Sequence, residues 1–147
     1  MAELTKQQIG RCGELLVQYV LLKHGVESAL LTTDQGVDLV AFHSKTQKAV
    51  TIQVKTSTHR GPADDKHLLW EIPEDCPADY IAAVDLSRNK FWLISVEEFK
   101  LRAPHCAKGR LRLWWPLPEC EYGRAPRREE QFKEYEMDTA IPKVFGH

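Results

Sequence analysis

The sequence has no segment that would place the chain in a membrane or on a secretory route. Its 147 residues include no apolar run of the ~20 residues that a membrane helix needs. They also include no charged-then-apolar start with a small-residue cleavage site. The four cysteines are Cys12, Cys76, Cys106 and Cys120. Because none of them forms a C-x-x-C pair, we expect free thiols rather than a zinc site, and a cytoplasmic protein.

Several motifs of nucleotide-dependent and hydrolytic enzymes are also absent. There is no G-x-G-x-x-G or G-x-x-x-x-G-K-[ST] loop, no H-x-x-x-H pair and no recognisable Ser-His-Asp order. The formal net charge is -1, so the chain cannot bind nucleic acid through bulk positive charge and would have to use local patches. The length fits one domain, residues 1–147, which can bury a core without disulfides.

The periodicity predicts an α/β domain that begins with a helix. Thr5 is the expected N-cap, and apolar residues at helical spacing continue to about Lys23 and predict a largely buried helix. Gly10 and Gly13 lower helix propensity by ~1 kcal/mol each. We expect these glycines to let another backbone or a ligand come close.

The rest of the chain predicts a run of strands followed by helical pieces. Strands are expected within residues 36–57, 68–72, 79–86 and 90–96, with a short helix from residue 96, a late edge strand in 109–117 and a polar helix over 126–137. This order predicts one mainly antiparallel mixed sheet of about four or five strands, flanked by helices. The core would cover about residues 5–99, with 100–147 as a C-terminal extension.

The stretch 36–57 predicts a hairpin whose two faces differ. If His43 pairs with Lys48, one face is apolar and carries the opposed pairs Leu39–Ile52, Ala41–Val50 and Val37–Val54. A slip of one residue would turn a carboxylate onto this apolar face, which supports the register.

The other face of the hairpin carries polar groups at its open end. Asp38 lies opposite Gln53 and diagonal to Lys55. One interpretation is a structural Asp–Lys pair. The other is a metal site, because Mg²⁺ prefers oxygen ligands such as Asp38, the Gln53 amide oxygen and the Val54 carbonyl. Lys55 would then act on the attacking water or on a phosphate.

These residues resemble the PD-(D/E)XK nuclease superfamily. That signature has an aspartate on one strand, an acidic residue and a lysine two apart on the next, and a glutamate on the preceding helix. Here "GVDLVAF" supplies Asp38, "VTIQVKTS" supplies Gln53 and Lys55, and Glu14 takes the helix position. The resemblance covers about Thr5 to Phe99. It implies a restriction-endonuclease-like fold and Mg²⁺- or Mn²⁺-dependent hydrolysis of DNA to 5′-phosphate and 3′-hydroxyl ends.

One position departs from this pattern. Gln53 stands where the superfamily usually has an acidic residue, so one anionic metal ligand is lost. Similar Q-x-K versions occur among group I intron homing endonucleases of this superfamily. The change leaves two other functions open. One is a nuclease-fold module that binds nucleic acid or a protein partner without catalysis. The other is a purely structural or inhibitor protein. Small nucleases that cut both DNA strands often need two sites, which would favour a homodimer.

Further candidate contacts to nucleic acid follow from local composition. Gln18 lies one helical turn beyond Glu14. For Glu14 itself, the alternative interpretation is an exposed charge on the helix surface. Basic residues near Trp114 and Trp115 could grip a phosphate backbone, although an edge strand with exposed arginines and buried tryptophans is the interpretation we favour. The predicted contacts are Gln18, Thr56, Ser57, Arg60, Lys108, Arg110 and Arg112. For the residues of "KTSTHR", the alternative interpretation is a polar loop that does not contact nucleic acid.

Overall fold

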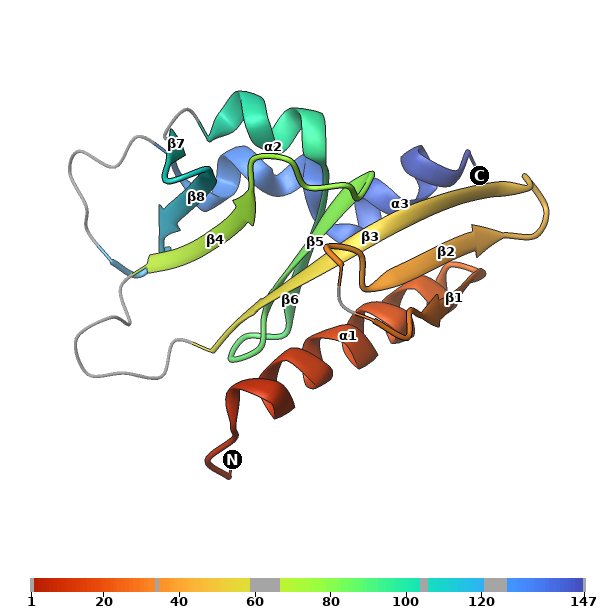
Figure 1. Cartoon of the computed structure of the whole chain (residues 1–147), viewed down its shortest axis with the longest axis horizontal. Helices are drawn as coiled ribbons and strands as arrows, with labels where there is room; N and C mark the ends of the chain where they lie inside the picture. The colour runs from red at the N-terminus through yellow and green to blue at the C-terminus, as the bar shows by residue number, and fades with distance from the viewer. Residues whose placement is uncertain (1, 34, 59–66, 104–105, 121–126, 147) are drawn as a thin grey trace.

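A computed structural model describes residues 2–33, 35–58, 67–103, 106–120 and 127–146 of the chain (Figure 1). Its first element is helix α1, Lys6–Lys23. Thr5 and Gln8 form a capping box, in which the Gln8 amide N–H donates to the Thr5 hydroxyl and the Thr5 amide N–H donates to the Gln8 side chain. The predicted start and end of this helix are confirmed.

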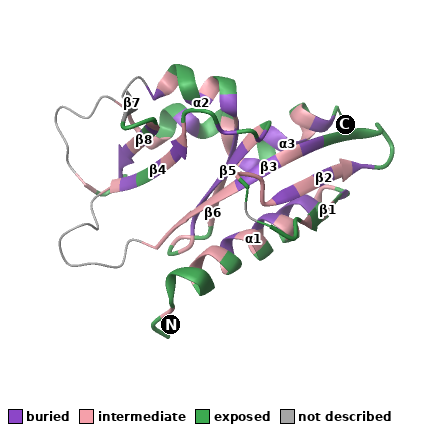
Figure 2. Cartoon of the chain, viewed as in Figure 1, coloured by how far each residue is buried: buried purple, intermediate pink, exposed green. Residues whose placement is uncertain are grey.

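Helix α1 buries one side only. Its buried residues are Gly13, Val17, Val20 and Leu21. Leu15, Tyr19 and Leu22 on the outer side are each more than half exposed, as the exposed stripe along α1 in Figure 2 shows. The expectation of a largely buried helix was therefore wrong, because a single sheet covers only one side of α1.

A mixed five-stranded sheet in the order β1-β2-β3-β5-β6 forms the centre of the fold. Its strands are β1 (Val26–Leu30), β2 (Leu39–His43), β3 (Lys48–Ser57), β5 (Tyr80–Asp85) and β6 (Lys90–Ser95). β3 and β5 are parallel, whereas the other neighbouring pairs are antiparallel. Leu39 opposes Ile52 and His43 opposes Lys48, which confirms the predicted hairpin register. β1 had no counterpart in the sequence prediction.

Two layers cover this sheet. Helices α1 and α3 (Met137–Phe145) pack on one face. The other face packs against helix α2 (Val96–Arg102), the 3-10 helix η1 (Glu129–Tyr135) and a second, three-stranded sheet. Its strands, in the order β4-β8-β7, are β4 (His67–Pro73), β8 (Arg110–Pro116) and β7 (Cys106–Ala107). β5 is therefore buried on both faces, as its nearly continuous apolar sequence requires.

Several details of the fold differ from the sequence prediction. β4 and β8 pair with each other outside the central sheet, and β8 is the middle strand of its sheet rather than an edge. Within the segment predicted as a polar helix, the structure has the 3-10 helix η1, which buries Phe132 against Trp115. Val37 packs into the cluster opposite the one that Val54 joins, because β2 begins only at Leu39. Among the described residues, no helix combines the length and apolarity needed to cross a bilayer.

Candidate functional site

The candidate site lies where β3 extends beyond the end of β2. β3 has ten residues and β2 has five, so the edge of β3 beyond Ile52 has no β2 partner. Asp38, just before β2, fills this place, and its Oδ2 accepts a hydrogen bond of 2.7 Å from the Val54 amide. Since the N–H and C=O of one strand residue point to the same side, the Val54 carbonyl also faces this open edge.

A cavity of about 590 Å³ lies between this open end of β3 and the first half of α1. Its walls include Glu14 from the helix and Asp38, Gln53, Val54 and Lys55 from the hairpin, together with Thr56 and Ser57. The structure thus brings to one cavity the four residues that the nuclease resemblance implied. These residues come from three elements that are separate in the sequence.

Glu14 reaches the cavity because α1 lies close against β3. A Cβ at Gly13 would stand 1.8 Å from the Thr56 hydroxyl oxygen, so only glycine allows this approach. Nothing lies within 4 Å of the corresponding point at Gly10, which lines the cavity. The Glu14 carboxylate is 3.1 Å from Arg11 Nη1. This exposed pair is weak and can open for another ligand.

Gln53 is buried, with 7% of its surface exposed. Its Oε1 lies 3.2 Å from the Sγ of Cys76, which is 8% exposed and belongs to the connection between β4 and β5. Sequence reasoning expected Cys76 to be a free thiol and gave no reason to place it at the site. Only the three-dimensional pairing of β3 with β5 reveals it.

The cavity carries both basic and acidic side chains. Lys6 and Lys55 face the same space as Glu14 and Asp38. Within the described part of the chain, the Lys55 ammonium makes no hydrogen bond or ion pair. The described residues also contain no cluster of three or more His, Cys, Asp or Glu side chains placed to hold a metal. A metal ion here would depend on two carboxylates supplemented by carbonyl oxygens.

The remaining predicted contacts lie elsewhere or have other partners. Gln18 does not line the cavity, and its amide donates to the Ser28 carbonyl of β1 at 3.3 Å. Thr56 and Ser57 line the cavity, and the Thr56 hydroxyl is buried without a hydrogen-bond partner among the described residues. Arg60 lies outside the described residues.

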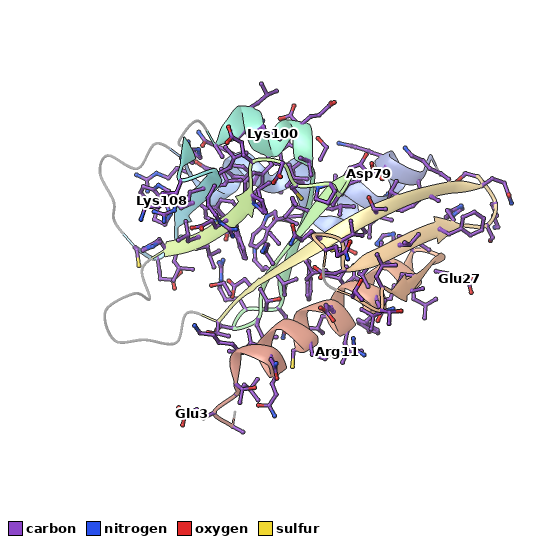
Figure 3. All side chains as sticks on the ribbon, in the orientation of Figure 1. Glu3, Arg11, Glu27, Asp79, Lys100 and Lys108 are labelled. Carbon is purple, nitrogen blue, oxygen red and sulfur yellow. The ribbon has the colours of Figure 1, made fainter. Side chains whose placement is uncertain are left out.

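The basic stretch belongs to the second sheet. Arg110 and Arg112 both bind Glu71 of β4, at 2.7 and 2.8 Å. The hydrogen bond from Arg110 is the main reason that the pKa of Glu71 is lowered, against the effect of burial, and Arg112 adds to it. Lys108 is exposed in the turn before β8, far from Arg11 of α1 (Figure 3).

The two tryptophans of this stretch differ. Trp115 is 1% exposed, whereas Trp114 is half-buried and packs edge-on against His67, with ring centroids 5.8 Å apart. The favoured interpretation of the basic stretch, exposed arginines with buried tryptophans, therefore holds fully for Trp115 only.

Comparison with solved structures identifies two nucleases with this architecture. The bacterial homing endonuclease I-Ssp6803I superposes with a TM-score of 0.67 at 15% identity, over 97% of this chain and 92% of that one. The Holliday junction resolvase Hjc of the archaeal hyperthermophile Archaeoglobus fulgidus superposes with a TM-score of 0.51 at 16% identity, over 71% and 82%. The chain shares the fold of these two nucleases. This confirms the predicted restriction-endonuclease-like architecture. No protein-family model and no curated protein matches the sequence.

Proposed function

We propose that this chain is a metal-dependent endonuclease that hydrolyses DNA phosphodiester bonds. The observation that carries the proposal is the meeting of Glu14, Asp38, Gln53 and Lys55 at one cavity. The fold supports it, because the two proteins named above that share it are DNA nucleases. The proposal includes that the chain is active with Gln53 in the usual acidic position, which is the Q-x-K variant of the motif.

The donor atoms at the open edge of β3 suit Mg²⁺ or Mn²⁺. Asp38 and Glu14 offer carboxylate oxygens and Val54 offers a backbone carbonyl, which are the hard oxygen ligands that these ions prefer. The hydrogen bond from the Val54 amide holds the Asp38 carboxylate in place beside that carbonyl. Glu14 would join them by leaving Arg11, at the small cost of an exposed ion pair.

The chain's own residues would then position the phosphate and balance its charge. A bound Mg²⁺ supplies Lewis-acid polarisation of the phosphate group. The Lys55 ammonium, which has no partner among the described residues, would stabilise the negative charge that develops on the phosphate or orient the attacking water. The hydroxyl of Ser57 lines the same cavity and would hold a neighbouring phosphate oxygen.

The test is cleavage of supercoiled plasmid, linear duplex and single-stranded DNA in Mg²⁺ or Mn²⁺. The wild-type chain should cut at least one of these substrates, and Asp38→Ala and Lys55→Ala should each cut it at least about 10²-fold more slowly. Glu27→Ala on β1 and Lys100→Ala on α2 are the matched controls, because both side chains are exposed and lie away from the cavity (Figure 3). Full activity of either cavity variant would refute the assignment.

A second candidate is a nuclease-fold module that binds DNA without cutting it. Gln53 in the acidic position favours it, as does the lack of a three-ligand acidic cluster among the described residues. Calorimetric titration with Mg²⁺ separates the two functions. Saturable binding that Asp38→Ala abolishes would count against the module.

We also propose that the active form is a homodimer, because one cavity cuts one strand at a time. Light scattering after gel filtration measures this directly, and a monomeric mass with full duplex cleavage would refute it.

Free thiols at Cys12, Cys76 and Cys120 agree with the cytoplasmic location that we infer from the sequence.

A further inference from the structure

The connection between β4 and β5 places a thiol directly behind Gln53. Cys76 Sγ lies 3.2 Å from Gln53 Oε1 and 4.0 Å from the Gly36 carbonyl oxygen. A thiol has one hydrogen to donate, and the Gln53 oxygen is the nearer acceptor by a wide margin. Both side chains are more than nine-tenths buried, so water does not compete strongly for this bond.

This bond selects which end of the Gln53 amide meets the cavity. A carboxamide carries its oxygen and its nitrogen on opposite arms of one planar group. Because Cys76 engages the oxygen, the nitrogen is the arm left for the cavity that Gln53 lines. An amide nitrogen donates hydrogen bonds and cannot serve as an oxygen ligand for Mg²⁺. It suits the oxygens of a phosphate group.

The segment that carries Cys76 is fixed on two sides. Pro77 packs so closely on Gly36 that a Cβ there would stand 2.8 Å from the proline ring, and Gly36 leads into Asp38 two residues later. Asp79 binds Thr51 of β3 reciprocally, with its carboxylate and its amide each making a 2.9 Å hydrogen bond. The connection therefore contacts both β3 and the segment that leads into β2.

We propose that Cys76 is a positioning residue that turns the Gln53 amide nitrogen toward the cavity, where it donates to a non-bridging phosphate oxygen of bound DNA. Gln53 is then a phosphate-binding residue and not a metal ligand. The metal is left to Asp38, Glu14 and the Val54 carbonyl. The identity of the ligand as DNA rests on the proposed function.

The first part of the test separates metal binding from phosphate binding. Calorimetry with Mg²⁺ should give Gln53→Ala an affinity within about twofold of the wild-type chain, while Asp38→Ala loses at least about tenfold. An equal loss in both variants would show that Gln53 is a metal ligand and would overturn the inference.

The second part measures affinity for a short fluorescent DNA duplex at low salt. Cys76→Ala should weaken binding about three- to tenfold, as expected for a lost hydrogen bond, and Cys76→Ser should restore it because a hydroxyl also donates. Cys120→Ala, which removes a thiol that does not line the cavity, is the control. Unchanged affinity in Cys76→Ala, or equal loss in the alanine and serine variants, would overturn the positioning role.

Gln53→Met keeps the side-chain volume and removes the amide, so it replaces Cys76→Ala if that variant does not fold. It should lose DNA affinity to the same degree and keep Mg²⁺ affinity, and unchanged DNA affinity would overturn the inference.

A wild-type chain that binds DNA without cutting it would refute the endonuclease proposal alone. Cutting that is insensitive to Cys76→Ala would refute this inference alone, and no DNA binding at all would refute both.

Discussion

Charged side chains are paired differently at the cavity and on the second sheet. At the cavity, Lys55 has no partner within the described residues and Glu14 has only an exposed one. On the second sheet, Arg110 and Arg112 share the carboxylate of Glu71. Both regions looked like phosphate-binding candidates in the sequence. The comparison teaches that a basic side chain is available to a ligand only where the fold does not place an acidic side chain beside it.

The largest effect should come from the unpaired lysine of the cavity. Lys55→Ala should lower DNA cleavage by about 10²–10³-fold, the scale of losing one charge-stabilising group in an active site. Arg112→Ala should change cleavage by less than about twofold, because Glu71 already neutralises that guanidinium. Single-turnover cleavage rates measure both. A loss in Arg112→Ala comparable to that in Lys55→Ala would place the second sheet in the DNA interface.

The next largest effect should come from a buried ion pair beside the second sheet. Arg88 joins Asp85, which is fully buried, to Glu129 of η1, whose side chain is 9% exposed. Removing the shared cation in Arg88→Met should lower the free energy of unfolding by about 3 kcal/mol. Arg11→Met, which breaks the exposed pair with Glu14, should cost less than about 1 kcal/mol. Urea unfolding compares them, and equal costs would contradict the different roles assigned to these pairs.

Close packing under the cavity predicts a smaller effect. Gly13→Ala should destabilise the fold by about 1–3 kcal/mol, because the added methyl meets the Thr56 hydroxyl at 1.8 Å. Gly10→Ala, three residues away with open space around it, should stabilise the helix by up to ~1 kcal/mol. Thermal and urea unfolding test the pair. Similar stability changes in the two variants would mean that α1 is not seated on β3 at Gly13.

The smallest effect concerns acid stability on the second sheet. The pKa of Glu71 is lowered, chiefly by the hydrogen bond from Arg110, so its ionised form is favoured in the folded state. Its contribution is therefore present above its ordinary pKa of 4.5 and is lost as the pH falls through the lower folded value. Wild-type protein should lose up to about 1 kcal/mol more than Glu71→Gln over this range. Parallel pH profiles of urea unfolding would contradict this.

The sequence predicted the hairpin and its polar end because the signals were local. Alternating apolar residues and a polar turn set the register from Leu39–Ile52 to His43–Lys48. That register predicted that Asp38, Gln53 and Lys55 would lie together, and all three line one cavity. The capping pattern at Thr5 likewise located α1. These features depend on neighbouring residues, which is the range over which periodicity and turn chemistry are informative.

The rest depends on contacts between distant segments. Glu71 and Arg112 are directly opposed although 41 residues separate them, and no local pattern encodes such a pairing. Cys76 reaches Gln53 only because β5 runs parallel to β3 and carries the preceding connection behind it. Gln18 has the helical spacing of a site residue, yet the position of β1 turns it toward Ser28.

The most direct test of the account is a crystal structure of the chain with Mn²⁺ and a short DNA duplex, read from anomalous diffraction. The account predicts a Mn²⁺ peak at ~2.1 Å from a carboxylate oxygen of Asp38, with the Val54 carbonyl among its ligands and Lys55 facing the nearest phosphate. DNA bound at the cavity with no Mn²⁺ peak there, or Mn²⁺ bound only elsewhere on the protein, would contradict it.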